Sequence, residues 1–268
     1  MIIELLNGTR FDIADYSLKR LFHRIPSAEI SHDTATVEGM GDIITQTTIL
    51  NRTISVELLY IAQDIYDYYL LRDELNELFT RDDAFYIIFK REPYKRWKVK
   101  LAQQFATEPN PRMEPFTVEF RTVDKYAESI ADTSTIKEWD VDKWGWNGTI
   151  DWDEDLTYTF NTNLFVVKNL GNVPIDPCES ELEIIVKGEF PNGLTIRNET
   201  TGDIYQYKST LSSTDELVLK GIRTLKNGIS DFKNTNKKLL TLAVGNNSIT
   251  VEGGTLTSIA FNFRFLYK

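Results

Sequence analysis

Hydrophobic and polar residues alternate in steps of two along most of the chain, which is the pattern of β-strands buried on one face. Between residues 53 and 61, for example, Ile54, Val56 and Leu58 alternate with polar neighbours. Asn7-Gly8 separates two short apolar runs, and both residues tolerate the positive φ angles of a tight hairpin turn. In the first half of the chain we expect strands at residues 2–6, 9–13, 34–37, 43–50, 53–61, 84–90, 95–101 and 116–122.

One segment steps by three and four residues instead of two. Between residues 63 and 79, Tyr68, Leu71 and Leu75 recur at helical spacing, while aspartates and glutamates occupy the other side. This spacing predicts an amphipathic helix over residues 63–79.

The second half consists of short strand patterns separated by turn signals that contain glycine and asparagine. This arrangement is typical of an antiparallel β-sandwich, so the whole chain is expected to be mainly β, with one helix in its first half. We expect a first domain at residues 1–130, a linker at 131–157 and a second domain at 158–268. The strands expected in the second half are 164–169, 182–188, 194–198, 204–208, 216–219, 238–242, 247–252 and 258–267.

The expected linker is polar but rich in tryptophan. A free polar tether rarely exposes large aromatic side chains, so we expect this linker to be ordered and to pack on a neighbour. Trp144 and Trp146 are its candidate contact residues.

Charge and cysteine content exclude several function classes. The net charge is −10, without the basic excess with which nucleic-acid-binding proteins neutralise phosphates, so sequence-specific nucleic-acid binding is disfavoured. The single cysteine, Cys178, rules out an intramolecular disulfide framework. No apolar run is long enough to cross a bilayer, and the N-terminus does not resemble a signal peptide, so synthesis and folding in a reducing cytoplasm are expected.

The search for catalytic chemistry gives little. His23 and His32 lack the spacing of metal ligands and are interpreted as surface or boundary residues, and Cys178 as a half-buried thiol. The acidic run at residues 151–155 lacks the glycine and glutamate of a calcium loop and is interpreted as a solvated turn. Sequence spacing does not test for a pair of catalytic carboxylates, so a hydrolase remains an alternative. We expect a protein that is not an enzyme, with no cofactor and no metal.

The strongest local charge is a basic stripe between residues 90 and 101. On a strand, Arg96, Lys98 and Lys100 point to one face, opposite Trp97 and Val99. The simpler interpretation is a hairpin with one solvated cationic face. The functional one is a surface that meets an acidic partner or lines a passage for nucleic acid. The candidate interface or lumen residues here are Lys90, Arg91, Arg96, Lys98 and Lys100.

Several segments, in the same order along nearly the whole chain, resemble the distal tail proteins of long-tailed phages. In the first half they are the opening hairpin at Asn7-Gly8 and the strand, helix and hairpin order from residue 53 to 101. The sequence phrases are PFTVEF at 115–120, DKY at 124–126, KWG at 143–145, YTF at 158–160, VKNLGNVP at 167–174, IRN at 196–198 followed by TG at 201–202, and LAVGNN at 242–247.

The resemblance implies an N-terminal belt domain related to tail-tube proteins, a β-sandwich with a helix and a hairpin, followed by a galectin-like sandwich. It implies a hexameric ring at the virion tail tip, whose lumen passes the genome with non-specific DNA contact. The implied partners are further copies of the chain, the major tail-tube protein, the tape-measure protein, a tail-associated fibre or lysin protein and, in some relatives, receptor-binding proteins.

The alternative function is a carbohydrate-binding adhesin module of a cell-wall-associated protein. Such a module needs exposed aromatic residues in the second sandwich. All five tryptophans precede that sandwich, and the galectin sugar-binding signature is missing, which leaves Tyr205 and Tyr207 as candidates for stacking on a sugar.

Overall fold

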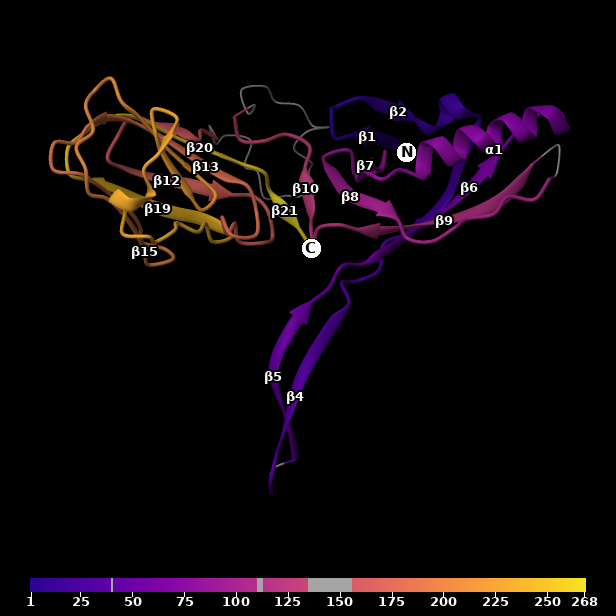
Figure 1. Ribbon diagram of the computed structural model, residues 1–268, viewed down its shortest axis with the longest axis horizontal. Helices are drawn as coiled ribbons and strands as arrows, with labels where there is room; N and C mark the ends of the chain where they lie inside the picture. Colours follow the sequence, from indigo (N-terminus) through magenta and orange to yellow (C-terminus); the bar gives the residue numbers. More distant parts are fainter. Residues whose placement is uncertain (40, 110–112, 135–155) are drawn as a thin grey trace. The chain divides into compact units, whose positions relative to one another are not determined.

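The computed structural model describes residues 1–39, 41–109, 113–134 and 156–268, and the chain forms two compact units (Figure 1). The first unit comprises residues 1–127 with Lys268, and the second comprises residues 128–267. Antiparallel sheets dominate both, and α1 (Ile65–Phe79) is the only α-helix in the described part of the chain. The predicted fold class is thereby confirmed. Residues 135–155, which include most of the expected linker with Trp144 and Trp146, lie outside the described residues.

The first unit is built on one antiparallel sheet with the strand order β2-β1-β7-β8-β9-β6-β3. The sheet is strongly curled. The His23 ring on β3, its last strand, stacks on Phe89, which follows β7, with 4.0 Å between the ring centroids. The strands are β1 (Ile2–Leu5), β2 (Arg10–Asp12), β3 (Leu18–Arg24), β6 (Thr53–Tyr60), β7 (Phe85–Ile88), β8 (Lys95–Leu101) and β9 (Glu114–Thr122), with a short 3-10 helix, η1 (Ile13–Tyr16), between β2 and β3.

The helix α1 covers one face of this sheet, as its apolar stripe predicts. It begins after Asp64, whose side chain accepts hydrogen bonds from the backbone N–H groups of Tyr66 and Asp67. Phe79 packs against Phe120 of β9, with 5.5 Å between ring centroids. The strict alternation of buried residues along β6 provides the apolar surface on which the helix rests.

The Asn7-Gly8 turn has a different form from the expected two-residue turn. Gly8 has a φ of +85°, but Asn7 is not among the residues with positive φ. The Leu5 carbonyl accepts a hydrogen bond from Gly8 N–H, and Asn7 Oδ1 accepts one from Thr9 N–H. The hairpin therefore closes over a three-residue loop in which glycine supplies the left-handed residue and asparagine supplies a side-chain acceptor.

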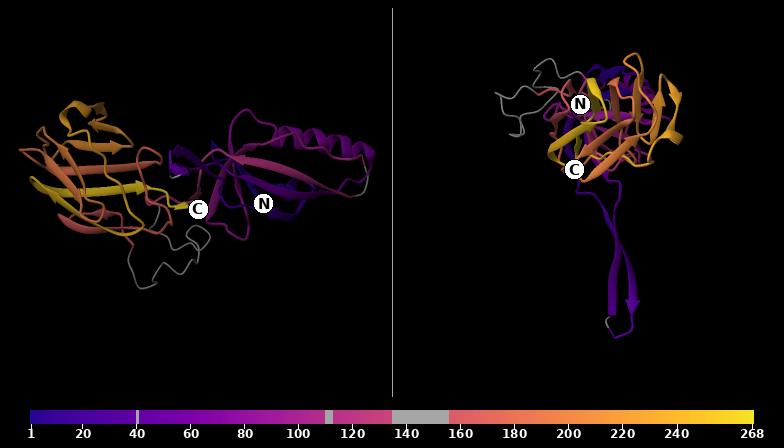
Figure 2. Two further views of the ribbon diagram at one scale, coloured as in Figure 1. Left: turned by 90° about the horizontal axis from the view of Figure 1, so that it is seen from below. Right: turned by 90° about the vertical axis from the view of Figure 1, so that its left-hand side faces the viewer.

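A long hairpin, which we call the arm, forms a separate two-stranded sheet of the first unit (Figures 1 and 2). Its strands are β4 (Ile30–Val37) and β5 (Gly41–Ile49), paired from Ile30 opposite Ile49 to Val37 opposite Gly41. β4 begins four residues before the predicted strand at 34–37, and β5 spans 41–49 instead of the predicted 43–50. Nearly every residue of the arm is exposed on both faces, so the alternation that marks a half-buried strand is missing from its sequence.

The second unit contains two antiparallel sheets, with strand orders β11-β20-β13-β16-β17-β18 and β12-β19-β14-β15. Their inward side chains form a single core, in which Phe165 packs against Phe261 at 6.0 Å between ring centroids. The strands are β11 (Thr159–Phe160), β12 (Leu164–Asn169), β13 (Leu182–Glu189), β14 (Leu194–Asn198), β15 (Asp203–Tyr207), β16 (Glu216–Lys220), β17 (Arg223–Lys226), β18 (Ile229–Ser230), β19 (Gly245–Glu252), β20 (Thr255–Phe263) and β21 (Leu266–Tyr267), with a short 3-10 helix, η2 (Phe232–Asn234).

The expected strand at residues 238–242 is wrong. This segment pairs with the rest of the unit only through an isolated bridge between Leu242 and Ile175. Side chains bind the backbone of Thr241 instead: its N–H donates to Asp203 Oδ2 at 2.9 Å, and Asn198 donates to its carbonyl at 2.8 Å. The alternating burial of Leu240 and Leu242 therefore reflects an irregular segment that is held by side-chain hydrogen bonds.

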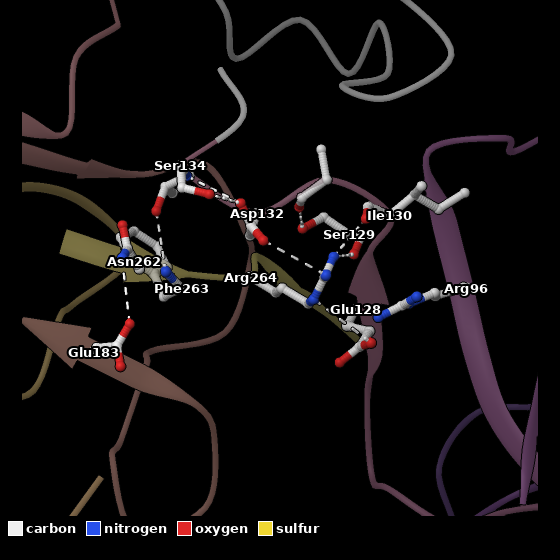
Figure 3. A network of polar contacts seen from close by, with 12 residues as sticks. Arg96, Glu128, Ser129, Ile130, Asp132, Ser134, Glu183, Asn262, Phe263 and Arg264 are labelled. Atoms are coloured by element: carbon white, nitrogen blue, oxygen red, sulfur yellow. Dashed lines mark hydrogen bonds and ion pairs between the residues drawn. The ribbon is translucent and has the colours of Figure 1, made fainter. Parts of the chain in front are cut away.

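The first residues of the second unit are held against its C-terminal strands (Figure 3). Ser129 N–H donates to the Phe265 carbonyl at 2.8 Å, and Thr133 N–H donates to the Phe263 carbonyl at 3.0 Å. Arg264 donates to the carbonyls of Ser129 and Ile130 and lies 3.7 Å from the Asp132 carboxylate. The two ends of the unit are thus joined by a strand-like contact and one arginine. The strand that opens this region is β10 (Ala127–Ser129).

Candidate interaction surfaces

The predicted basic stripe lies on β8, with its side chains where the alternation places them. Trp97 and Val99 are buried in the core, whereas Lys98 is half-buried and Lys100 exposed on the other face. Arg96 shares that face and stacks over Tyr86 of the neighbouring strand, with its guanidinium carbon 3.9 Å from the ring centroid. The structure therefore brings Arg96, Lys98 and Lys100 to one surface of the sheet.

This face is neutralised by acidic groups of the same unit, which lie on segments distant in sequence. Glu4 on β1 is 4% exposed and forms ion pairs with both Arg96 and Arg10. The remaining contacts are Lys90 with Asp12 at 2.5 Å, Lys98 with Asp124 at 3.9 Å, and Lys100 with the Asp82 carbonyl at 2.8 Å. The surface is thus a network of alternating charge, held by the sheet, and four of the five basic candidates belong to it.

Glu4→Gln is expected to lower the free energy of unfolding of the first unit by about 2 kcal/mol, because it removes the carboxylate that pairs with both Arg10 and the nearly buried Arg96. Thermal denaturation of the full chain measures this loss. The matched control is Glu29→Gln, since Glu29 is 62% exposed and lies 3.9 Å from Arg121, where an ion pair contributes little. Equal losses in the two variants would contradict the assigned role of Glu4.

Arg91 is separated from the other basic candidates and faces β3. It is exposed in the turn after β7 and close enough to Arg20 to lower the pKa of the Arg20 guanidinium, an effect second to the burial of that group. Arg20 Nη1 lies 2.5 Å from His23 Nδ1. Among the described residues, no carboxylate forms an ion pair with Arg20 or Arg91. We call Arg20, His23 and Arg91 the cationic cluster.

His23 is held in its neutral form by this setting. Burial against Phe89 lowers the pKa of the imidazole, and the positive charge of Arg20 lowers it further. A neutral ring accepts at Nδ1 the hydrogen bond that the Arg20 guanidinium donates. The cluster therefore presents fixed donors and positive charge around an apolar ring.

The arm offers a second surface, with apolar side chains in contact with solvent. Ile44 is 61% exposed, Ile30 58% and Ile43 45%. A two-stranded hairpin alone is at best marginally stable in water, and large apolar side chains exposed on both faces add to that deficit. The arm therefore exposes apolar surface that its own unit does not cover.

The sequence did not predict that Arg20 and His23 belong to a charged cluster. It also did not predict that the arm forms an exposed apolar surface. A signal for the arm was present, since between Arg24 and Arg52 the sequence contains no lysine or arginine but four acids, Glu29, Asp33, Glu38 and Asp42. The cationic cluster had no such signal, because its members come from segments that only the curl of the sheet brings together.

The tyrosines considered for sugar stacking are not available for it. Tyr205 and Tyr207 are 2% and 1% exposed, and they hydrogen-bond to Thr224 and Asp231. Burial raises the pKa of Tyr205 to about 12, as is usual for a phenol in a core. The structure thus removes the aromatic residues on which the carbohydrate alternative rested.

Cys178 is exposed, which corrects the expectation of a half-buried thiol, because the turn at Asp176 directs it outward. His32 is exposed on the arm and contacts Thr47. In the described part of the chain, no three acidic, histidine or cysteine side chains gather in a way that could hold a metal ion. No helix in that part is long and apolar enough to span a membrane. The acidic run at 151–155 lies outside the described residues.

Comparison with known proteins gives a family-model match within the first unit and a similar fold for the whole chain. Residues 11–122 match the model of a family described as phage tail protein RIFT-related domain. The structure is similar to the crystal structure of the Dit protein of phage SPP1, described as a paradigm of the hub adsorption apparatus in phages that infect Gram-positive bacteria. The two chains are 15% identical and match over 99% of each, with a TM-score of 0.71.

A chain of the phage p2 baseplate, in its activated conformation with Sr, is 13% identical and matches over 98% of this chain and 96% of that one, with a TM-score of 0.47. None of the curated proteins matches the sequence. Residues 11–122 therefore match a phage tail protein domain family, and the resemblance of the chain to siphophage distal tail proteins, expected from its sequence, is confirmed.

Proposed function

We propose that six copies of this chain form a ring at the phage tail tip, which joins the tail tube and tape-measure protein to the fibre, lysin or receptor-binding apparatus. The first unit forms the ring, whose lumen passes the genome, and the second unit extends from it. The protein acts by holding other components in place and is not an enzyme. It is made in the cytoplasm of the host bacterium and acts in the virion.

The observation that carries this proposal is the arm. A closed ring of identical subunits uses heterologous contacts, in which one surface of each copy meets a different surface of the next. The arm is a surface of this kind, since it extends from its own unit and exposes apolar residues that need a cover (Figure 2). The family of residues 11–122 and the fold shared with the SPP1 Dit protein support a place in the tail.

The mass of the full chain in solution tests the ring. We expect a stable hexamer, or two rings joined into a multiple of six, measured by light scattering coupled to size exclusion. A monomer at high concentration would contradict the proposal.

Ile44→Asn is expected to raise the dissociation constant of the ring at least tenfold, because it replaces an apolar contact of the arm without adding charge. The fold of the free chain should not change, since Ile44 is 61% exposed in it. The matched control is Ile229→Asn, an exposed isoleucine of the second unit at 74%. Loss of the ring in both variants, or in neither, would argue against the arm as the contact.

A further inference from the structure

The cationic cluster has the charge and the hydrogen-bond donors that suit an anionic group. On the β8 face, each arginine or lysine meets an acid or a carbonyl of its own unit, with Glu4 serving two of them. Arg20 and Arg91 differ, because Arg91 lies two residues after Phe89, on which His23 stacks beside Arg20, and no carboxylate in the described part of the chain forms an ion pair with either arginine. Two neighbouring guanidinium groups repel one another, and an anion placed between them relieves that repulsion.

The side chains of the cluster are already held in place for binding an anionic group. The His23 ring lies at 17° to the ring of Phe89, which is 2% exposed and therefore fixed in the core. His23 in turn holds the Arg20 guanidinium, whose central carbon lies 5.8 Å from the Phe89 ring centroid. A side chain held by stacking and hydrogen bonding loses little further entropy when it binds a partner.

The surroundings of the cluster favour a protein partner over nucleic acid. Leu21 and Phe22, next to Arg20 on β3, are 44% and 48% exposed. β3 also ends the strand order of the sheet, so one of its edges is open among the described strands. Apolar side chains beside an open edge suit an extended, apolar and acidic segment, whereas phosphate binding makes no use of them.

The arm has this composition. Asp33 and Glu38 form no ion pair with any described residue, and the exposed Ile43 and Ile44 supply the apolar component. The segment between Arg24 and Arg52, which contains the arm, has four acids and no lysine or arginine. The arm of one copy is therefore complementary to the cationic cluster of another in both charge and apolar character.

We propose that Arg20, His23 and Arg91 are the receptor for the acidic arm of the next copy in the ring. This inference rests on the proposed ring and names the two surfaces that form its interface. The arm carboxylates lie between the two guanidinium groups, and the arm isoleucines cover Leu21 and Phe22. Because each copy carries one arm and one receptor, the contact propagates in a single direction around the ring.

Paired charge reversal tests the assignment. The receptor variant combines Arg20→Glu with Arg91→Glu, and the arm variant combines Asp33→Lys with Glu38→Lys. Each is expected to raise the dissociation constant of the ring at least tenfold when it is alone. Mixed in equal amounts, the two variants should regain the wild-type mass. In a ring where they alternate, each reversed arm meets a reversed receptor, and each native arm meets a native receptor. Six positions permit such alternation.

The control is Lys208→Glu with Lys233→Glu, which makes the same charge change at two exposed lysines of the second unit and should leave the mass unchanged. Circular dichroism checks the fold of each variant. Arg91→Glu alone replaces the receptor variant if the half-buried Arg20 proves necessary for folding, and it must then weaken the ring on its own.

The outcomes separate this inference from the ring itself. A wild-type hexamer whose reversal variants stay hexameric overturns the receptor and leaves the ring standing. Variants that dissociate but do not recover on mixing rule out the arm as the occupant. Unchanged mass together with lost binding of a double-stranded DNA probe would assign the cluster to phosphate instead. A monomeric wild type overturns both proposals.

Discussion

Replacing Asn247 by alanine is expected to lower the free energy of unfolding of the second unit by about 4 kcal/mol. Asn247 on β19 is completely buried, and its amide joins β12, β14 and the segment at Ala243. Asn247 Oδ1 accepts hydrogen bonds from Ala243 N–H at 2.8 Å and from the Asn198 amide at 3.0 Å. Alanine removes this acceptor from the buried Asn198 amide and from the partly buried Ala243 N–H.

The donor side of the same amide adds to the loss. Asn247 Nδ2 donates to the carbonyls of Ala243 at 2.9 Å, Gly245 at 3.1 Å and Val167 at 3.3 Å. Buried carbonyls that lose a donor cost desolvation energy that the small alanine side chain does not offset. The matched control is Asn246→Ala, because the Asn246 side chain is exposed, and we expect a change below about 0.5 kcal/mol there.

Urea denaturation of both variants, followed by near-ultraviolet circular dichroism, measures the difference. Since Tyr205 and Tyr207 are buried in the same unit, the aromatic signal reports on its packing. A loss at Asn247 no larger than that at Asn246 would show that the amide network is not what holds these segments.

Gly253→Ala is expected to cost more than about 4 kcal/mol, through strain and steric overlap together. Gly253 connects β19 to β20 with a φ of +108°, and a Cβ atom there would lie 2.2 Å from the Gly193 carbonyl oxygen. That oxygen belongs to backbone, which cannot turn aside as a flexible side chain can. The clash is therefore expected to open the turn that joins the two sheets.

Gly202→Ala is the control that separates the two causes. Gly202 also has a positive φ, +80°, but an added Cβ atom would meet nothing within 4 Å. We expect about 1 kcal/mol there, the cost of a left-handed conformation alone. Thermal unfolding of the two variants gives the comparison, and similar losses would mean that backbone conformation outweighs the contact with Gly193.

Buried asparagine side chains also explain why short sequence phrases carry the resemblance to distal tail proteins. The phrases VKNLGNVP, IRN and LAVGNN contribute Asn169, Asn198 and Asn247, and all three side chains are buried. Asn198 and Asn247 bond to each other, and Asn169 donates to the Val173 carbonyl at 2.9 Å. Each asparagine satisfies backbone groups at a place where a strand ends, which fixes its identity and its spacing to the neighbouring glycine.

Strand predictions from the sequence were less accurate for segments that do not alternate between core and solvent. The sequence placed the ends of β12 and β14 correctly, because both strands alternate between core and solvent. It shortened β4 at residues 34–37, since an exposed hairpin needs no apolar face. It predicted a strand at 238–242 from alternating leucines, although side-chain hydrogen bonds hold that segment.

By itself, the sequence determined the mainly β class, the one helix of the described chain, the turns marked by glycine, and which face of β8 carries its basic residues. These features follow from local periodicity and from backbone preferences, which neighbouring residues specify. Only the tertiary structure decided which charges are neutralised. Glu4 reaches Arg96 across the sheet, whereas Arg20 and Arg91 form no ion pair with a described carboxylate, because the curl of the sheet and the register of its strands bring distant residues together.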